Sequence, residues 1–332
     1  MSFSASGWIN AIKNDGKTQA FPIITFPGLE LTGKTVQDLT TNGEAQAECI
    51  IALADRYHSL GGVMVMDLSV EAETFGADIQ FSDNEVPTVK NRLINDLSEI
   101  EGMEVPVIGS GRTGEYLKAA RMASEAIHDK PVFGGIIGPY SLAGRLVDIT
   151  EMMTLILIDP EAMHKLLRKC TRFLIEYAGA YKAEGVAGVV IAEPAAGLLW
   201  PEACVEFSSE YIKQIVEAVQ DDSFMVILHN CGNTVPLVPS MVYTGSMACH
   251  FGNAVDMAEI LPQIPSDILA MGNIDPVGVF RNGTPQKVES ITRELLGKAA
   301  GYPNFVISSG CDVPPGSPLE NIDAFYRAIE NQ

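Results

Sequence analysis

Two segments far apart in the chain carry three side chains whose types and spacing fit a zinc site. His229 and Cys231 are separated by one residue. On an extended backbone such a pair points to one face, because strand side chains repeat every two residues. Cys311 lies downstream among glycines and prolines. One imidazole and two thiolates give Zn²⁺ three ligands and leave a fourth position open, which is typical of a catalytic zinc site. A core histidine beside a core cysteine is the alternative, but the combined pattern favours zinc.

The composition argues against several classes of partner. The chain has 332 residues and a formal net charge of −20, and such a surface repels the phosphates of nucleic acids and anionic membranes. No apolar run of about 18 residues is present, so no transmembrane helix is predicted. The first residues lack the basic and apolar regions of a signal peptide. We therefore expect a cytoplasmic protein that binds neither nucleic acid nor membrane, and a homodimer is compatible with the sequence.

Short apolar segments alternate with longer segments of helical periodicity along the chain. Such alternation is typical of parallel strands joined by right-handed helical crossovers. Eight repeats in a chain of this length predict a single-domain (β/α)₈ TIM barrel. An open doubly wound sheet is less favoured, because no Gly-x-Gly-x-x-Gly follows a predicted strand. The predicted strands are residues 22–26, 63–68, 133–137, 189–192, 225–229, 247–251, 268–271 and 305–308.

The helical patterns fill the intervals between these strands. The predicted helices are residues 43–59, 89–98, 113–127, 159–184, 206–219, 234–243, 255–261 and 286–299. Residues 1–20 are predicted to form an N-terminal extension, or a cap at the end of the barrel opposite the active site. Residues 21–332 are predicted to form the barrel domain itself.

The carboxyl ends of the strands in a (β/α)₈ barrel converge on one mouth, where active sites lie. Three acidic residues follow predicted strands, namely Asp67, Glu193 and Asp275. We expect Glu193 to orient a substrate or donate a proton, with a structural hydrogen-bond acceptor as the alternative. Asp67 and Asp275 are predicted to bind substrate, and Asp275 could instead accept a hydrogen bond from His229. We expect His250 to be a core histidine or one that supports the zinc ligands.

Gly-Asn pairs recur at residues 232–233, 252–253 and 272–273, twenty residues apart each time. The favoured interpretation is turn chemistry, because glycine and asparagine tolerate positive φ at strand-to-helix corners. A shared catalytic role for all three pairs is the less favoured alternative.

Four segments together resemble the uroporphyrinogen decarboxylase superfamily, and within it the zinc-dependent, corrinoid-linked methyltransferase branch. These segments are residues 138–146, 229–234, 271–276 and 310–322. The resemblance implies a (β/α)₈ barrel and zinc held by His229, Cys231 and Cys311. It also implies methyl transfer to or from the cobalt of a separate corrinoid protein. In the first segment Tyr140 and Arg145 are predicted to contact substrate, with a salt bridge at the barrel rim as the alternative for Arg145.

The decarboxylase activity itself is less favoured by the sequence. That enzyme acts on a porphyrinogen with many carboxylates and uses an arginine-bearing segment after its first strand. Here the corresponding residues 26–33 contain no arginine, and 22 lysines and arginines stand against 42 acidic residues. The decarboxylase also needs no zinc triad, so a decarboxylase-like lyase is kept only as the second alternative function.

The residue at position 253 bears on which substrate zinc would activate. Relatives that use coenzyme M tend to carry a glutamate there as a fourth zinc ligand, whereas this chain has Asn253, which we expect to bond substrate or water. Asp256 could substitute, or could simply be an acid at a helix N-terminus. The sequence therefore predicts a methoxylated aromatic, demethylated at oxygen, as the small-molecule methyl donor. Methyl transfer from a methylcobamide to coenzyme M, a thiol, is the first alternative.

Overall fold

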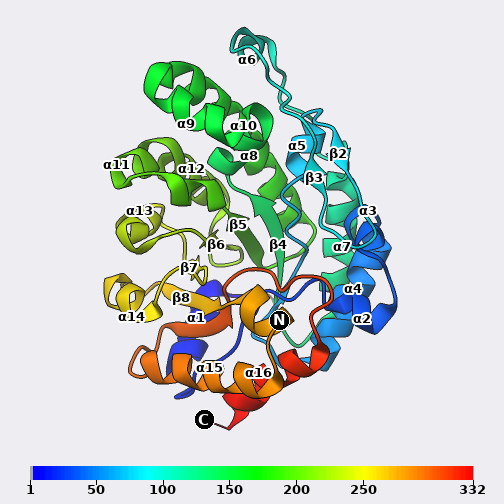
Figure 1. The fold of residues 1–332 in the computed structure, drawn as a ribbon, viewed down its shortest axis with the longest axis vertical. Coiled ribbons are helices and arrows are strands. Elements are labelled where there is room, and N and C mark those ends of the chain that lie inside the picture. Colours follow the sequence, from blue (N-terminus) through cyan, green and yellow to red (C-terminus); the bar gives the residue numbers. More distant parts are fainter. Residues whose placement is uncertain (1–2, 332) are drawn as a thin grey trace.

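Seven parallel strands form a curled sheet in the computed structural model, which describes residues 3–331 (Figure 1). Their order across the sheet is β1-β4-β5-β6-β7-β8-β9, so each strand after β4 lies beside its predecessor in the chain. The strands are almost entirely buried, as expected when helices cover a parallel sheet. The bounds are β1 Gly62–Val63, β4 Val132–Ile137, β5 Gly188–Ala192, β6 Met225–Asn230, β7 Ala248–Phe251, β8 Leu269–Ile274 and β9 Phe305–Ser309.

An extended segment near residue 20 joins the two edges of this sheet. The amide of Phe21 donates to the carbonyl of Ile307 on β9 (2.9 Å), and the carbonyl of Ala20 accepts from the amide of Leu60, just before β1 (2.8 Å). The segment thus stands where the first strand was predicted and closes the ring. The prediction of a (β/α)₈ barrel is confirmed.

The predicted strand over 22–26 does not form a regular ladder, because the next amides of this segment bond to side chains. The amide of Ile23 donates to Oγ of Ser309 (2.9 Å), and the amide of Thr25 donates to Oδ1 of Asp312 (3.0 Å). These side chains take the hydrogen bonds that strand carbonyls would otherwise accept.

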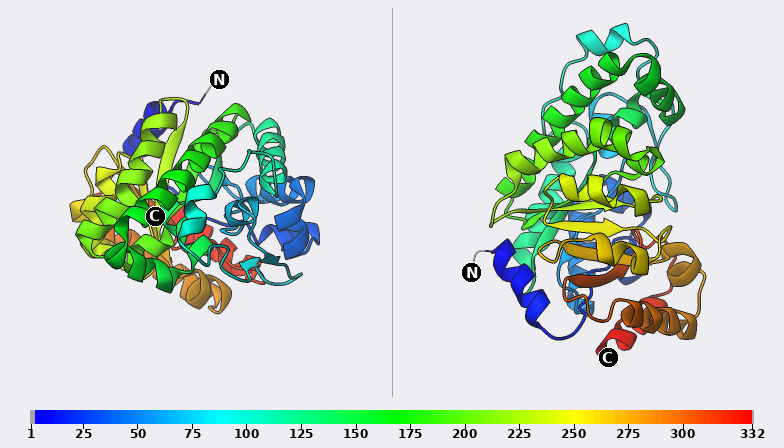
Figure 2. Two further views of the ribbon diagram at one scale, coloured as in Figure 1. Left: turned by 90° about the horizontal axis from the view of Figure 1, so that it is seen from above. Right: turned by 90° about the vertical axis from the view of Figure 1, so that its left-hand side faces the viewer.

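Helices cover the outer face of the barrel (Figures 1 and 2). All predicted helices except that at 89–98 have a counterpart, and within residues 3–331 no helix is long and apolar enough to cross a membrane. The chain inserts two further helices after β4 before it returns along α10, and a last helix, α16, ends it. The bounds are α4 Gly43–Arg56, α7 Thr113–Ala126, α8 Pro139–Val147, α9 Ile149–Ile158, α10 Pro160–Ala183, α12 Glu210–Val219, α13 Val238–Tyr243, α14 Met257–Ile260, α15 Pro285–Lys298 and α16 Leu319–Glu330.

The predicted helix over 89–98 is wrong. Thr88–Val89 is the short strand β3, which pairs antiparallel with β2 (Ile79–Gln80), and the next helix, α6, covers Ser98–Gly102. The amides of Leu93 and Ile94 both donate to the carbonyl of Leu146 on α8 (2.8 and 2.9 Å). A tertiary contact therefore takes the backbone donors that a local helix would need.

Helix α1 (Ala5–Asn14) packs against the interior of the barrel at one side of the sheet, where Figure 2 shows it in dark blue. Its buried residue Ile9 belongs to the same apolar cluster as Phe21 and Phe133. The ring of Trp8 lies 5.7 Å from that of Phe133. This packing agrees with a cap on the barrel, whereas the division into an extension of residues 1–20 and a domain of residues 21–332 stays a prediction.

Candidate metal centre at the barrel mouth

Strands β6 and β9 bring the three predicted zinc ligands together. His229 lies near the end of β6, Cys231 follows that strand, and Cys311 follows β9. One ligand atom from each residue, an imidazole nitrogen and two sulfurs, all lie within 4.8 Å of one another. Because β7 and β8 separate the two strands in the sheet, the curvature of the barrel is what makes the three side chains converge.

The imidazole of His229 has one ring nitrogen engaged and one free. Nδ1 lies 2.8 Å from Nδ1 of His250, while the buried Nε2 has no hydrogen-bond partner among the described residues. A buried polar atom without a partner is costly, and a metal ion would satisfy it. His250 uses both its nitrogens elsewhere, since its Nε2 contacts Oγ of Ser308 at 2.7 Å. As expected, His250 supports the site and is not placed as a ligand.

The thiol of Cys231 differs in its pKa from the five other cysteines of the chain. A hydrogen bond from Cys311 lowers the pKa of the Cys231 thiol to about 4, and His229 contributes in the same direction. The same contact, together with burial, raises the pKa of Cys311. Burial raises the pKa of all four remaining cysteines, which are Cys49, Cys170, Cys204 and Cys249. A thiolate at Cys231, a second thiol and a free imidazole nitrogen match the donor set that zinc prefers.

Asn253 lies beside the third ligand. A Cβ added to Gly310 would lie 2.6 Å from the amide nitrogen of Asn253 and 3.1 Å from its Oδ1, so the loops after β7 and β9 are in close contact. Asp256 is committed elsewhere: its Oδ1 accepts from the amide of Ala258 (3.0 Å) and its Oδ2 pairs with Lys298 (3.1 Å). The fourth position therefore has no acidic side chain from this loop, and the role of Asn253 toward a ligand stays a prediction.

Glu193 is a structural hydrogen-bond acceptor, the alternative expected from the sequence, and its catalytic role stays a prediction. Its carboxylate oxygens accept from the amides of Tyr140 (3.0 Å) and Ser141 (2.6 Å) at the N-terminus of α8. Burial raises the pKa of Glu193 to about 7, although these hydrogen bonds act in the opposite direction. The side chain of Tyr140 is fully buried and its hydroxyl donates to the sulfur of Met153 (3.3 Å), and its contact with a substrate stays a prediction.

Asp67 and Asp275 are also used within the protein. The buried carboxylate of Asp67 forms an ion pair with Arg112 and accepts from the hydroxyl of Ser69 (2.6 Å). Asp275 caps the short helical turn Pro276–Arg281 by accepting from the amides of Val277 (2.9 Å) and Gly278 (2.8 Å). The structure thus shows a role within the protein for each carboxylate, while their predicted contacts with substrate stay predictions.

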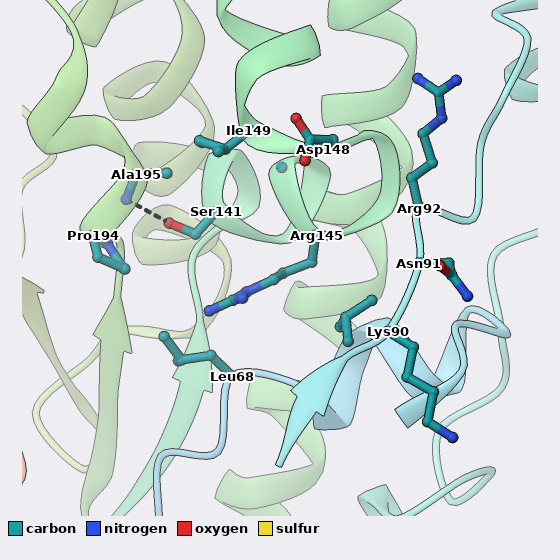
Figure 3. A pocket seen from close by; sticks show the side chains of 12 residues that line it. Leu68, Lys90, Asn91, Arg92, Ser141, Arg145, Asp148, Ile149, Pro194 and Ala195 are labelled. Carbon is teal, nitrogen blue, oxygen red and sulfur yellow. Dashed lines mark hydrogen bonds between the residues drawn. The ribbon is translucent and has the colours of Figure 1, made fainter. Parts of the chain in front are cut away.

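Arg145, also predicted to contact substrate, lines an open pocket. It projects from α8 into a pocket of about 320 Å³ and extends toward Leu68 and the Pro194–Ala195 backbone (Figure 3). The side chain is exposed, and among residues 3–331 it has no carboxylate partner. Pro194 follows β5, which pairs with β6 so that Ala192 lies opposite His229. The pocket therefore begins one strand away from the metal centre.

Two residues that support the site, Asp312 and Ser308, were not predicted from the sequence. Asp312 accepts hydrogen bonds from the amide and the hydroxyl of Thr25, which fixes the Cys311 loop to the first segment of the barrel. Burial raises the pKa of Asp312 to about 7. Ser308 contacts His250 from β9. The adjacency of Asp312 to a predicted ligand was an available signal, whereas no sequence pattern singles out Ser308.

A family model described as uroporphyrinogen decarboxylase (URO-D) matches residues 19–332. The chain belongs to the uroporphyrinogen decarboxylase family. The match covers the whole barrel, so this membership confirms the family resemblance seen in the sequence.

Relatives of this family member include both methyltransferases and decarboxylases. A methylcobamide:CoM methyltransferase from Methanosarcina mazei is 29% identical over 325 residues, which are 93% of this chain and 94% of that protein. A uroporphyrinogen decarboxylase from Synechococcus is 25% identical over 280 residues, 81% of this chain and 77% of that protein. The solved structure of a methyltransferase from Methanosarcina mazei shares the fold, with a TM-score of 0.88 at 23% identity over 99% of both chains.

Proposed function

We propose that this chain is a zinc-dependent methyltransferase that moves a methyl group between the cobalt of a corrinoid, carried by a separate protein, and a small thiol. The observation that carries the proposal is the metal centre, where two thiols and an unpartnered buried imidazole nitrogen converge. Three soft or borderline donors leave one coordination position for a substrate. The methyltransferase relative that matches 93% of the chain supports the same class of reaction.

A thiol replaces the methoxylated aromatic as the favoured small substrate. The expectation of an aromatic ether rested on Asn253, but no comparison supports it, and the methyltransferase relative at 29% identity is named for coenzyme M. A thiol needs no acidic fourth ligand, since its own sulfur would take that position. The methoxylated aromatic is therefore kept as the alternative.

Different residues of the chain would bind the metal and the substrate. Zinc bound by His229, Cys231 and Cys311 would supply a Lewis acid that deprotonates a coordinating thiol at neutral pH. The rigid ends of β6 and β9 hold these ligands, and much of the rate enhancement would come from such positioning. Arg145, which has no carboxylate partner among residues 3–331, would bind the anionic end of a substrate such as coenzyme M, which carries a sulfonate.

The decarboxylase-like lyase is the remaining candidate, because the family contains both activities. A porphyrinogen with many carboxylates needs several cations at the mouth. Arg112, which is buried, is already paired with Asp67 and Glu73. Lys90 and Arg92 line the same pocket as Arg145, so its charge suits either class of anion, and the thiol is favoured because of the metal centre.

The experiment is a methyl-transfer assay that follows the cobalt spectrum. Methylcobalamin would be mixed with coenzyme M or a neutral thiol, and Co(I) cobalamin with methoxylated aromatics, each with and without a chelator. We expect loss of the methyl–cobalt absorbance with a thiol and zinc, and no change after chelation. Activity on uroporphyrinogen in the metal-free protein, or no metal-dependent change with any substrate, would refute the proposal.

A further inference from the structure

Three side chains and one backbone carbonyl, each from a different strand or extended segment of the barrel, form a continuous hydrogen-bonded chain that ends at the metal centre. Nδ1 of His229 on β6 lies 2.8 Å from Nδ1 of His250 on β7. Nε2 of His250 lies 2.7 Å from Oγ of Ser308 on β9. Oγ of Ser308 in turn lies 2.7 Å from the carbonyl oxygen of Phe21, in the segment that closes the barrel. All three side chains are buried, so no water from the mouth competes for these contacts.

The directions of these hydrogen bonds follow from the one group that can only accept. The carbonyl of Phe21 has no proton, so the hydroxyl of Ser308 donates to it. The same hydroxyl then has only lone pairs for His250, and Nε2 of His250 must carry a proton. Neither nitrogen of His250 contacts a carboxylate, and burial favours the neutral ring. Nδ1 of His250 is therefore an acceptor.

The hydrogen bond between His250 and His229 fixes which ring nitrogen of His229 donates. Because Nδ1 of His250 accepts, Nδ1 of His229 donates, and Nε2 is the nitrogen of His229 that is left to bind a metal. That nitrogen, Nε2, is the buried atom without a partner that faces the two thiols. A metal-binding histidine normally fixes its tautomer through a carboxylate or a backbone carbonyl. In this protein a second histidine and a serine relay the same constraint from a backbone carbonyl.

We propose that His250 and Ser308 are positioning residues that hold His229 in the tautomer whose Nε2 binds zinc. The inference rests on the zinc site of the proposed function, but the relay also has a signature in the metal-free protein. Without the hydroxyl of Ser308, His250 can place its proton on Nδ1. His229 would then accept at Nδ1 and carry its own proton on Nε2, where the metal must bind.

Two serines on β9 give a matched pair of variants. Ser308→Ala removes the hydroxyl that faces His250. Ser309→Ala removes an equally buried hydroxyl, which accepts from the amide of Ile23 (2.9 Å) and contacts no histidine. A similar loss of barrel closure is expected in both variants, so any difference between them reports the relay.

The first readout is ¹⁵N NMR of the histidine rings in the metal-free protein. In the wild type we expect His229 protonated at Nδ1 and His250 at Nε2, with the same pattern in Ser309→Ala and a mixed pattern in Ser308→Ala. The second readout is zinc affinity by competition with a chelator, which needs no methyl-transfer activity. We expect Ser308→Ala to bind zinc about 10- to 100-fold more weakly than Ser309→Ala, the range typical of residues behind a metal ligand.

Two substitutions of His250 keep the proposal testable if Ser308→Ala is poorly folded. His250→Asn offers an amide oxygen near the place of Nδ1 and is expected to retain zinc, whereas His250→Leu leaves His229 without an acceptor and is expected to lose it. Equal zinc affinity in both serine variants, or wild-type His229 protonated at Nε2 but not at Nδ1, would overturn the relay. A wild type with the expected NMR pattern but no zinc affinity would instead refute the zinc site of the proposed function.

Discussion

Gly252 packs directly against Cys231, so that a Cβ at position 252 would lie 2.4 Å from Cα of Cys231. Gly252, which follows β7, also donates its amide to the carbonyl of Asn230 (3.0 Å). Neither Gly232 nor Gly252 has the positive φ that the repeated Gly-Asn pairs suggest, whereas Gly272 does (φ 146°). The expected positive φ therefore occurs only at Gly272, and this glycine lies within β8 rather than at a strand-to-helix corner. At Gly252 the side chain is excluded because the backbone of a metal ligand occupies its place.

Gly252→Ala is expected to disturb the metal centre without touching a ligand atom. The added methyl group meets backbone, which cannot rotate away, so we expect a loss of about 1–3 kcal/mol in the free energy of unfolding and weaker zinc binding. Urea denaturation and chelator competition measure the two effects. Gly297→Ala is the control, because a Cβ on this exposed glycine of α15 meets no atom within 4 Å. That variant should be more stable by about 0.5–1 kcal/mol, and similar behaviour of the two variants would contradict the close approach.

Cys311→Ser is expected to abolish stoichiometric zinc binding and metal-dependent activity together. A hydroxyl is a far weaker zinc ligand than a thiolate, and the remaining two donors cannot hold the ion tightly. Metal analysis of purified protein and titration with a chelator test the loss, which we expect to exceed about 100-fold in affinity. Cys249→Ala provides the control, since Cys249 is buried in the apolar core and is not one of the three candidate metal ligands. Full zinc content in Cys311→Ser would remove Cys311 from the site.

Arg145→Ala is expected to raise the KM for an anionic thiol while leaving that for a neutral thiol nearly unchanged. The guanidinium projects into the pocket beside Leu68 and has no carboxylate partner in the described part of the chain. A charge-assisted hydrogen bond contributes about 1.5–3 kcal/mol, so the KM for coenzyme M should rise roughly 10- to 100-fold. Steady-state kinetics with both thiols measure the difference. Arg172→Ala, on the exposed face of α10, changes the net charge equally and serves as the control. Equal losses with both thiols would argue that Arg145 only supports the fold.

Glu71 makes the stability of the protein depend on pH in a direction opposite to that of ordinary surface acids. Burial raises the pKa of this carboxyl from 4.5 to about 7. Its Oε1 accepts from the amide of Ile137 (2.9 Å), while Oε2 has no partner among the described residues. A raised folded-state pKa means that the contribution of Glu71 to stability is complete below about pH 4.5 and is lost as the pH rises through about 7.

Glu71→Gln copies the protonated acid and therefore removes this dependence. We expect the variant to match the wild type at pH 4.5 and to be more stable by roughly 3 kcal/mol above pH 7, from 1.36 kcal/mol for each pKa unit. Urea unfolding at a series of pH values gives the difference. Glu217→Gln, exposed on α12, should follow the wild type throughout. A stability difference that stays constant with pH would show that the carboxyl of Glu71 does not titrate as stated.

The barrel and the candidate metal-binding group of His229, Cys231 and Cys311 could be predicted because each leaves a local trace in the sequence. Apolar strands and segments of helical periodicity can each be recognised from residues close together in the chain. The spacing of His229 and Cys231 likewise puts both on one face of a strand. The helix predicted over 89–98 failed for the opposite reason. Its amides bond to Leu146, a partner from another part of the chain that no local pattern records.

The tertiary structure alone decided which polar residues at the strand ends remain free for chemistry. Glu193, Asp67 and Asp275 have the residue types of an active site, yet α8, Arg112 and a helical turn use their carboxylates. It likewise decided that His250, not Asp275, meets His229. The sequence by itself determined the donor atoms and the barrel that carries them, because these depend on residue type and short-range period. Which groups stay unpaired depends on contacts between distant segments, and those contacts exist only once the barrel has closed.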